Sequence, residues 1–253
     1  MIQPRQFMQY AVALMIVMTF VTGANAAVTA LFDPDFTQAG STSDFNEIQD
    51  AQWTLDTGSG VYNNTITSQS NASSTAVNVT NVGSGTDFII SAQFTLDSLT
   101  GSDTTIGFGI LSPDGNLTDG SGSYYLADVA MSGRIRILEL NSSAPTVTSI
   151  INDAIDDLTT GTLYTIILAG MYTGGDLQLT FHVSDGSQGA QVSVTDTGTV
   201  LTGPYFGLRN RSGGAGSLDA DFSKFTIAVP SPAALPAGLT LMTLIGLRRH
   251  SRA

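Results

Sequence analysis

The sequence has 253 residues, which is enough for one large domain or two small ones. Its 21 acidic and nine basic residues give a formal net charge of −12, which argues against a nucleic-acid partner because phosphate binding needs clustered cations. The chain has no cysteine, which excludes a disulfide framework, a cysteine-ligated metal site and a thiol nucleophile.

The N-terminus has the pattern of a secretory signal peptide. A single cation, Arg5, precedes an apolar run at residues 10–21, and small residues follow it. A basic start, a short apolar stretch and a small-x-small site are typical of cleaved export signals. We therefore expect a signal peptide over residues 1–26, with Ala24 and Ala26 forming the cleavage site. The alternative is an uncleaved membrane anchor, although the run is shorter than the roughly 20 residues that span a bilayer.

Residues 27–228 are expected to form one all-β domain. Short runs of alternating apolar and polar residues, rich in Thr, Val, Ile, Tyr and Phe, are separated by Gly, Asn, Asp and Ser. The predicted strands cover residues 88–96, 105–111, 124–130, 134–140, 162–169, 177–183, 205–209 and 218–229. Turn residues at 131–133 and 173–176 predict two hairpins, and one short helix is expected at 152–158. This succession of antiparallel strands predicts a two-sheet sandwich.

The C-terminus combines an apolar stretch at residues 233–247 with two short motifs. These motifs are Val229-Pro230-Ser231-Pro232 before the stretch and Arg248-Arg249 directly after it. Residues 27–229 hold all 21 acidic residues and five cations, a net charge of −16. Because arginines beside an apolar run stay on the cytoplasmic side of a membrane, the tail is expected in the inner membrane with the domain outside.

The order of a Pro-x-Pro motif, an apolar helix and a basic cluster at residues 229–253 resembles the PEP-CTERM sorting signal. That signal is read by exosortases, membrane proteases of Gram-negative bacteria that make extracellular polysaccharide. The resemblance implies a transient anchor that is cut near the Pro-x-Pro motif. Two departures are Ser231, where the typical motif has Glu, and Pro236 within the apolar run. A plain tail anchor and an unprocessed tail are the alternatives.

Several short sequence segments between residues 45 and 229 resemble those of the concanavalin A-like, or laminin-G-like, jelly-roll superfamily. They are Trp53 before Gly60-Val61-Tyr62, Ile106-Gly107-Phe108-Gly109, Tyr125-Leu126-Ala127-Asp128, the segment 133–137, the segment 205–209, and Asp221-Phe222. The resemblance implies a jelly roll with one concave face, often used to hold glycans. The superfamily includes both lectin-like modules and glycosidases, so the fold alone does not decide between binding and catalysis.

Catalytic residues are scarce in the expected domain. A glycosidase needs two carboxyl groups across the scissile bond. The domain has two glutamates, Glu47 in an expected loop and Glu139 on the face shared with two isoleucines, and most of its aspartates occupy turns. The Glu-x-Asp-x-Glu strand of laminarinase-type enzymes is absent. His182 has no second histidine or cysteine in the domain to form a metal site or a base–nucleophile pair. We therefore predict a protein that is not an enzyme.

Calcium is the one cofactor that the sequence suggests. Asp219 and Asp221 share a side of the last strand, and Asp33 and Asp35 have the same spacing near the start of the domain. If the first and last strands lie together, four carboxylates converge, and Ca²⁺ prefers such oxygen ligands. The alternative is two unrelated surface pairs.

A glycan site is expected on the hairpin at residues 124–140. Aromatic rings stack on sugars, whereas Arg, Asp and Asn bind hydroxyl groups. Alternation places Tyr124 and Asp128 on one strand face, and it turns Arg134 and Arg136 outward if the neighbouring isoleucines line the core. The full set of candidates is Tyr124, Asp128, Arg134, Arg136, Arg209 and Asn210. Alternatively, the arginines pair with surface acids and the aromatic residues belong to the core.

Together these patterns predict an exported, non-catalytic protein of the cell surface or extracellular matrix of a Gram-negative bacterium. The expected partners are extracellular polysaccharide, an exosortase-type protease and, transiently, the inner membrane. Two other functions remain open: a glycoside-active enzyme of jelly-roll type that uses aspartates, and a purely structural or adhesive matrix component.

Overall fold

The computed structural model describes residues 28–48, 52–67, 72–80, 82, 85–101, 103–118, 122–141, 144–152, 154–213 and 216–230. The expected signal peptide, with Ala24 and Ala26, and the tail from Ser231 through Pro232, Arg248 and Arg249 lie outside these residues. The predictions for both ends therefore stay predictions. Within the described ranges, no helix combines the length and the apolar character that a membrane crossing requires.

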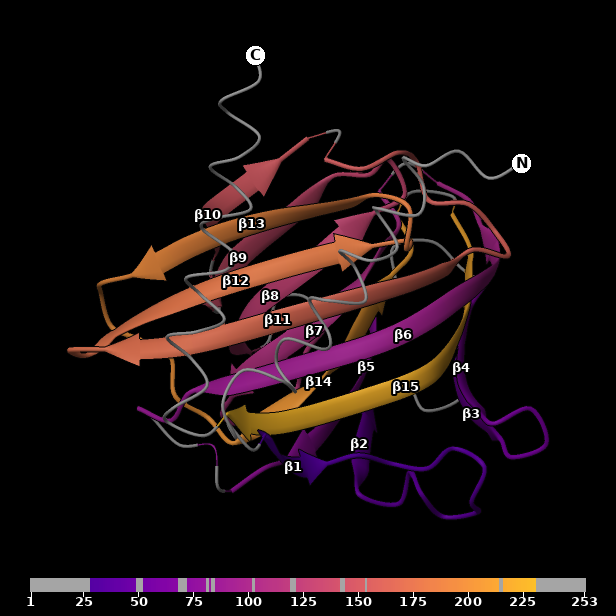
Figure 1. Ribbon diagram of the computed structural model, residues 1–253, viewed down its shortest axis with the longest axis horizontal. Coiled ribbons are helices and arrows are strands. Elements are labelled where there is room, and N and C mark those ends of the chain that lie inside the picture. The colour runs from indigo at the N-terminus through magenta and orange to yellow at the C-terminus, as the bar shows by residue number, and fades with distance from the viewer. Residues whose placement is uncertain are drawn as a thin grey trace, which may run out of the picture.

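The described chain forms two antiparallel sheets packed face to face (Figure 1). The eight-stranded sheet runs in the order β13 (Gly189–Asp196), β12 (Asp176–Ser184), β11 (Leu163–Thr173), β6 (Phe88–Leu99), β15 (Leu218–Pro230), β4 (Val61–Ile66) and β3 (Trp53–Asp56), with β1 (Val28–Phe32) also paired to β15. The seven-stranded sheet runs in the order β10 (Ala144–Ile151), β9 (Ile135–Asn141), β8 (Ser123–Ala130), β7 (Thr105–Ser112), β14 (Tyr205–Arg211), β5 (Ala72–Asn78) and β2 (Phe45–Ile48). The predicted all-β, antiparallel sandwich is confirmed.

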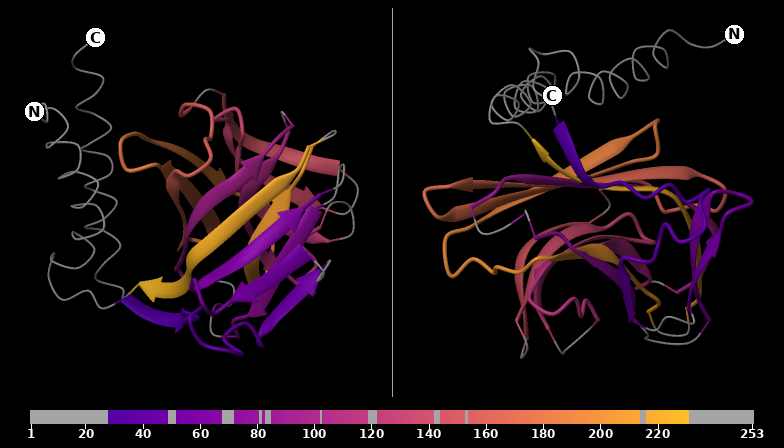
Figure 2. Two further views of the ribbon diagram at one scale, coloured as in Figure 1. Left: turned by 90° about the vertical axis from the view of Figure 1, so that its right-hand side faces the viewer. Right: turned by 90° about the horizontal axis from the view of Figure 1, so that it is seen from below.

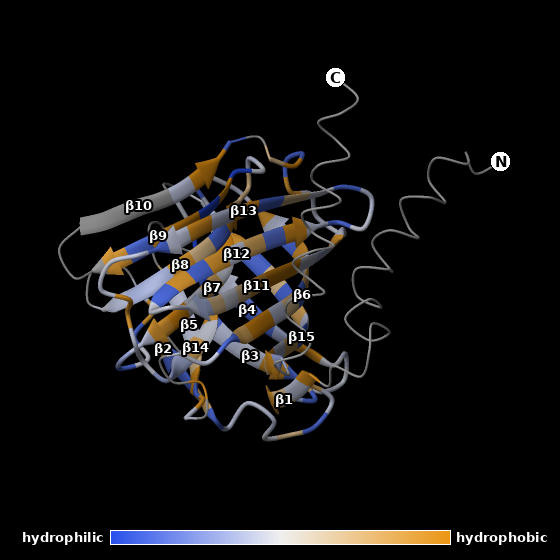
Figure 3. Ribbon diagram, turned by 60° about the vertical axis from the view of Figure 1, so that its left-hand side comes forward, coloured by the Kyte–Doolittle hydropathy of each residue, from blue (hydrophilic) through white to orange (hydrophobic). Residues whose placement is uncertain are grey.

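The alternation of apolar and polar residues along each strand builds the core. Successive side chains of a strand point to opposite faces, so every second residue of β6, from Phe88 to Leu96, is buried. The same alternation colours the strands orange and blue in turn in Figure 3. Each large apolar side chain that leaves water contributes about 1.5–3 kcal/mol, which makes the region between the sheets the main source of stability.

The seven-stranded sheet is curved, and its hollow side faces away from the flatter eight-stranded sheet (Figure 2, right). This outer surface of the seven-stranded sheet is called the arched face below. It carries a second, smaller apolar cluster of Ala76, Leu117, Tyr124, Leu126 and Leu138. Leu117 belongs to the loop after β7, so the loop folds back over the sheet. The loop begins at a bulge where Leu111 has a positive φ of 57°.

Both expected hairpins form, because β8 pairs with β9 and β11 pairs with β12. The β11–β12 turn uses Gly174 and Gly175, whose φ values of 64° and 102° suit glycine. The expected helix at 152–158 is wrong. Its described residues form bends and irregular backbone, because amides of this segment bond to the β8–β9 turn, where Gly133 O accepts from Ala154 N.

The last strand runs further than the domain boundary at residue 228. Val229 and Pro230, which the sequence places in the sorting signal, belong to β15 and pair with Thr29 and Val28 of β1. The first and last strands of the domain therefore lie side by side (Figure 1).

Candidate functional site

A row of polar side chains crosses the arched face through four neighbouring strands. Arg136 of β9 lies opposite Asp128 of β8, Asp128 lies opposite Gly107 of β7, and Gly107 lies opposite Arg209 of β14. The glycine leaves the space between Asp128 and Arg209 free of a side chain on β7. The pairing register therefore places the Asp128 carboxylate between two arginines, with Arg136 on one side and Arg209 on the other.

Asp128 and Arg136 form a two-pronged ion pair. Arg136 donates from Nε to Oδ1 of Asp128 at 2.6 Å and from Nη2 to Oδ2 at 2.8 Å. The Asp128 side chain is fully buried, whereas the Arg136 side chain keeps 16% of its surface exposed. Such bidentate geometry fixes a guanidinium more firmly than a single contact does. The pair thus holds an arginine in one orientation while part of it still reaches solvent.

The loop after β7 covers the centre of the arched face. Leu117 is fully buried over Gly109, where an added Cβ would lie 2.8 Å from Leu117 Cδ2. The carbonyl oxygen of Leu117 accepts a hydrogen bond from Arg209 Nε at 3.0 Å. Arg209 is consequently 1% exposed and acts as a support for the loop.

Four of the six sequence candidates are buried and therefore not placed for direct glycan contact: Asp128 and Arg209 in the polar row described above, and also Tyr124 and Asn210. Tyr124 is fully buried in the small cluster under Leu117, so its ring has no face open for a sugar to stack on. Asn210 points to the opposite side of β14 from Arg209, and it donates to Asn64 Oδ1 at 2.9 Å inside the sandwich. Both corrections have the same cause: the sheet has two faces, and each of these residues packs on a covered one. Arg136 on the arched face and Arg134, which directly precedes β9, each remain partly exposed.

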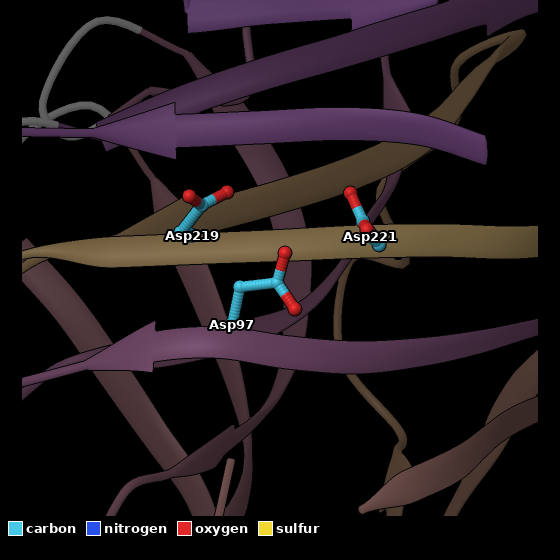
Figure 4. A group of neighbouring side chains, drawn as sticks. All are labelled: Asp97, Asp219 and Asp221. Atoms are coloured by element: carbon cyan, nitrogen blue, oxygen red, sulfur yellow. The ribbon is translucent and has the colours of Figure 1, made fainter. Parts of the chain in front are cut away.

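Three carboxylates meet on the outer face of the eight-stranded sheet (Figure 4). Asp97 of β6 joins Asp219 and Asp221 of β15, and one oxygen from each lies within 4.8 Å of the others. Asn63 of β4 donates to Asp219 at 2.7 Å and to Asp221 at 2.8 Å. Partial loss of hydration raises the pKa of Asp97 above its ordinary value, and repulsion from Asp221 and Asp219 raises it further. This arrangement can bind a hard cation, but its three carboxylates fall short of the six to eight oxygens that Ca²⁺ takes.

The expected convergence of four aspartates is wrong. Asp33 follows β1 and accepts a hydrogen bond from Thr226 at 2.9 Å, whereas Asp35 accepts one from the hydroxyl group of its neighbour Thr37 at 2.6 Å. The antiparallel pairing places β1 against the far end of β15, because Phe32 lies opposite Ile227. Asp33 is therefore separated from Asp221 along β15 by five residues, roughly 16 Å. Asp97 was missed, since it occupies a β-bulge that follows from strand pairing and not from alternation.

The two glutamates of the domain each lie near a buried tyrosine. Glu47 belongs to β2, not to the expected loop, and accepts a hydrogen bond from the Tyr62 hydroxyl group. Glu139 lies opposite Tyr125, whose hydroxyl group donates to Asp196.

A two-carboxylate site at Glu139 and Asp196 meets only part of the requirement for glycoside hydrolysis. Burial and, to a lesser degree, the charge of Asp196 raise the pKa of Glu139. However, both oxygens of Asp196 already serve the fold, one accepting from Tyr125 and the other from Gly198 N at 2.8 Å. Through these two hydrogen bonds Asp196 helps to anchor the segment between β13 and β14.

His182 lies on the outer face of β12 with its imidazole largely covered by neighbouring strands. An added Cβ at Gly189 would lie 3.2 Å from His182 Nε2, so the glycine makes room for the ring. Burial lowers the pKa of His182. The residue therefore favours its neutral form in the folded protein.

Comparisons with known proteins show the fold. No protein-family model matches the chain, and no curated protein sequence matches it. The carbohydrate recognition domain of Emp47p superposes with a TM-score of 0.55 at 14% identity, covering 82% of this chain and 98% of its own. The CBM2 module of the evolved Dit protein of Lactobacillus casei BL23 phage J-1 gives 0.57 at 10% identity, covering 82% and 98%. The exoplasmic/lumenal domain of VIP36, in a Ca²⁺/Man3GlcNAc-bound form, gives 0.53 at 13% identity, covering 79% and 89%.

At such low identities the likeness establishes architecture alone. The chain has a lectin-like, concanavalin A-like jelly-roll fold, as its sequence phrases imply. What a protein of this fold binds depends on its own side chains.

Proposed function

We propose that this protein is an exported surface or matrix component that associates with polysaccharide and does not change it chemically. The observation that carries the proposal is the Asp128–Arg136 pair, which fixes a partly exposed guanidinium on the arched face. A guanidinium held in this way presents its exposed part to solvent in a constant direction, which suits recognition of sugar hydroxyl groups. Arg134, which directly precedes β9 and is also partly exposed, supplies a second donor group.

The similar structures support this proposal. The Emp47p domain is a carbohydrate recognition domain, and the VIP36 domain was determined with a bound oligosaccharide. The strong negative charge of residues 27–229 also suits a protein that has to stay soluble in a hydrated polysaccharide gel.

Retention of the full chain on a column of its native exopolysaccharide tests the proposal. Arg136→Lys keeps a positive charge beside Asp128 but removes the bidentate pairing of the guanidinium with the carboxylate. Arg134→Ala removes the second donor group. We expect both variants to elute earlier than the wild type, whereas Lys224→Ala on the exposed surface of the other sheet elutes unchanged. Unchanged retention of Arg136→Lys and Arg134→Ala would rule out the arched face as the site.

Two alternatives have direct tests. Release of reducing sugar from the same polysaccharide would support a glycoside-active enzyme, for which Glu139 and Asp196 are the first residues to replace. A wild type that is not retained on any polysaccharide would favour a purely structural or adhesive role.

Export and sorting by the two ends are part of the same proposal. Mass spectrometry of the protein from its native cell is expected to find Ala27 as the first residue. Because Val229 and Pro230 are paired within β15, we expect any processing by an exosortase-type protease to cut beyond Pro230. A full-length protein with both ends intact in the cytosol would contradict this part.

Calcium stays a prediction, now with a different set of residues. The VIP36 domain was determined with Ca²⁺, and Asp97, Asp219 and Asp221 are the carboxylates of this chain that lie together. The corresponding measurement is given with the predictions below.

A further inference from the structure

A cavity of about 340 Å³ opens on one side of the sandwich, between β1 of one sheet and the β2–β5 pair of the other. Small-molecule sites commonly occupy about 300–1,000 Å³, so the volume is sufficient for a small ligand. The cavity is separate from the row of polar residues that crosses the arched face. Its wall includes Leu31, Phe32, Asp44, Asn78, Val79 and Thr80.

One wall of the cavity is apolar and held in place. Phe32 is half-buried, and its ring packs edge-on against Phe45 and Phe225, with centroid separations of 5.1 and 6.0 Å. Leu31 extends the same wall. A rigid aromatic ring with part of its surface open offers an apolar platform without a large loss of side-chain freedom on binding.

Two exposed polar side chains stand beside that wall. Phe45 pairs with Val77 in the antiparallel β2–β5 ladder. The next pair in the same register is Asp44 and Asn78, so these two residues lie directly opposite each other. Within the part of the chain that the structure describes, neither side chain takes part in a hydrogen bond. The carboxylate of Asp44 only accepts hydrogen bonds, whereas the amide of Asn78 both donates and accepts.

This combination selects a class of ligand. Adjacent hydroxyl groups of a sugar donate to a carboxylate and exchange hydrogen bonds with an amide, while the C–H face of the ring covers an aromatic surface. Asp44 and the net charge of −16 over residues 27–229 disfavour an acidic sugar. A single carboxylate is also too few ligands for a metal ion.

We infer that the cavity beside Phe32 binds one residue of a neutral saccharide, with Asp44 and Asn78 as its hydrogen-bonding groups. The ligand class rests on the proposed polysaccharide association, whereas the location rests on the cavity alone. The inference adds a second contact point on a different side of the domain from the arched face.

Calorimetric titration of the full chain with maltotriose, cellotriose and mannotriose, and with trigalacturonate as the acidic counterpart, tests the inference. We expect at least one neutral trisaccharide to bind, and Asp44→Ala and Asn78→Ala each to weaken it about tenfold, because each removes a hydrogen-bonding partner. Both residues are exposed, so the melting temperature is expected to stay unchanged. Asp157→Ala removes the same charge from another exposed position and serves as the matched control.

The outcomes separate the two proposals. If a neutral sugar binds but Asp44→Ala and Asn78→Ala behave like Asp157→Ala, the cavity is not the site and the proposed function stands. If no sugar binds and the wild type is not retained on polysaccharide, both fall. Tighter binding of trigalacturonate than of the neutral sugars would overturn the assignment of ligand class.

Discussion

The outer faces of the two sheets are built by the same alternation of side chains, but they differ in what covers them. On the arched face, Asp128 and Arg209 are buried, and the loop carrying Leu117 folds over Arg209 and Tyr124. On the eight-stranded sheet, Asp97 is exposed and its two partner carboxylates are partly exposed. Alternation decides which residues share a face, whereas a distant loop decides whether that face meets water.

The largest difference in the free energy of unfolding is expected between variants that remove a carboxylate from one face and from the other. Asp128→Ala leaves the Arg136 guanidinium without the carboxylate that fixes it, and breaking a buried ion pair typically costs about 3–5 kcal/mol. Asp97→Ala on the other face, at an exposed side chain, is expected to change stability by less than about 0.5 kcal/mol, as surface substitutions do. Urea unfolding measures both values, and equal effects would contradict the difference in burial.

A substitution at Leu117 tests how much the loop that covers the arched face contributes to stability. Leu117→Ala removes a fully buried side chain from the small cluster on the arched face, and we expect a loss of about 2–3 kcal/mol. Leu163→Ala, at a side chain that is 51% exposed, is the control with the same chemistry and an expected effect near zero. A Leu117 variant as stable as the Leu163 variant would show that the loop contributes little.

His182 is the exception on the eight-stranded sheet, because it is covered although it points outward. Its pKa is lowered by burial, so the unfolded chain takes up a proton at a higher pH than the folded protein does. Stability is therefore expected to fall as the pH drops below the ordinary histidine value of 6.5, by less than the Leu117 effect. Comparing wild type and His182→Gln between about pH 7.5 and pH 5.5 isolates this contribution. A wild type no more pH-sensitive than the variant would contradict it.

The acidic cluster of Asp97, Asp219 and Asp221 is expected to change the melting temperature least. Whether the cluster stabilises or destabilises the fold depends on whether a cation is bound. The pKa of Asp97 is raised, so its ionised form opposes folding and the stability from this group increases as the pH falls through that pKa. Without added metal, Asp97→Asn should slightly raise the melting temperature. If Ca²⁺ binds, calcium raises the wild-type melting temperature and the variant loses that gain. If neither calcium nor chelator changes the wild-type melting temperature, the cluster does not bind a stabilising Ca²⁺ ion.

Much of the arched face was predictable, but its burial was not. The period-two pattern of residues 124–140 predicts both strands, the turn between them and the grouping of Asp128 with the arginines, and these features are present. Nothing in the pattern shows that Tyr124 is buried. Its cover comes from Leu117, and the two meet because Gly109 leaves space above β7.

The acidic cluster and the cavity show a second limit of sequence reasoning. Asp97 joins Asp219 and Asp221 through a bulge in the pairing of β6 with β15, so its position depends on register. Asp44 meets Asn78 and Phe32 through three strands from two sheets. Spacing along the chain carries no signal for either group.

The sequence by itself determined the class of this protein: strands from alternation, turns from glycine and aspartate, and an antiparallel sandwich from their succession. These properties are local, because each follows from a few neighbouring residues and the two-residue period of a strand. Only the tertiary structure decided which outward-facing residues remain open, which carboxylates meet and where a cavity lies. Those properties depend on register and on loops that fold over distant strands, and both are set by packing across the whole domain.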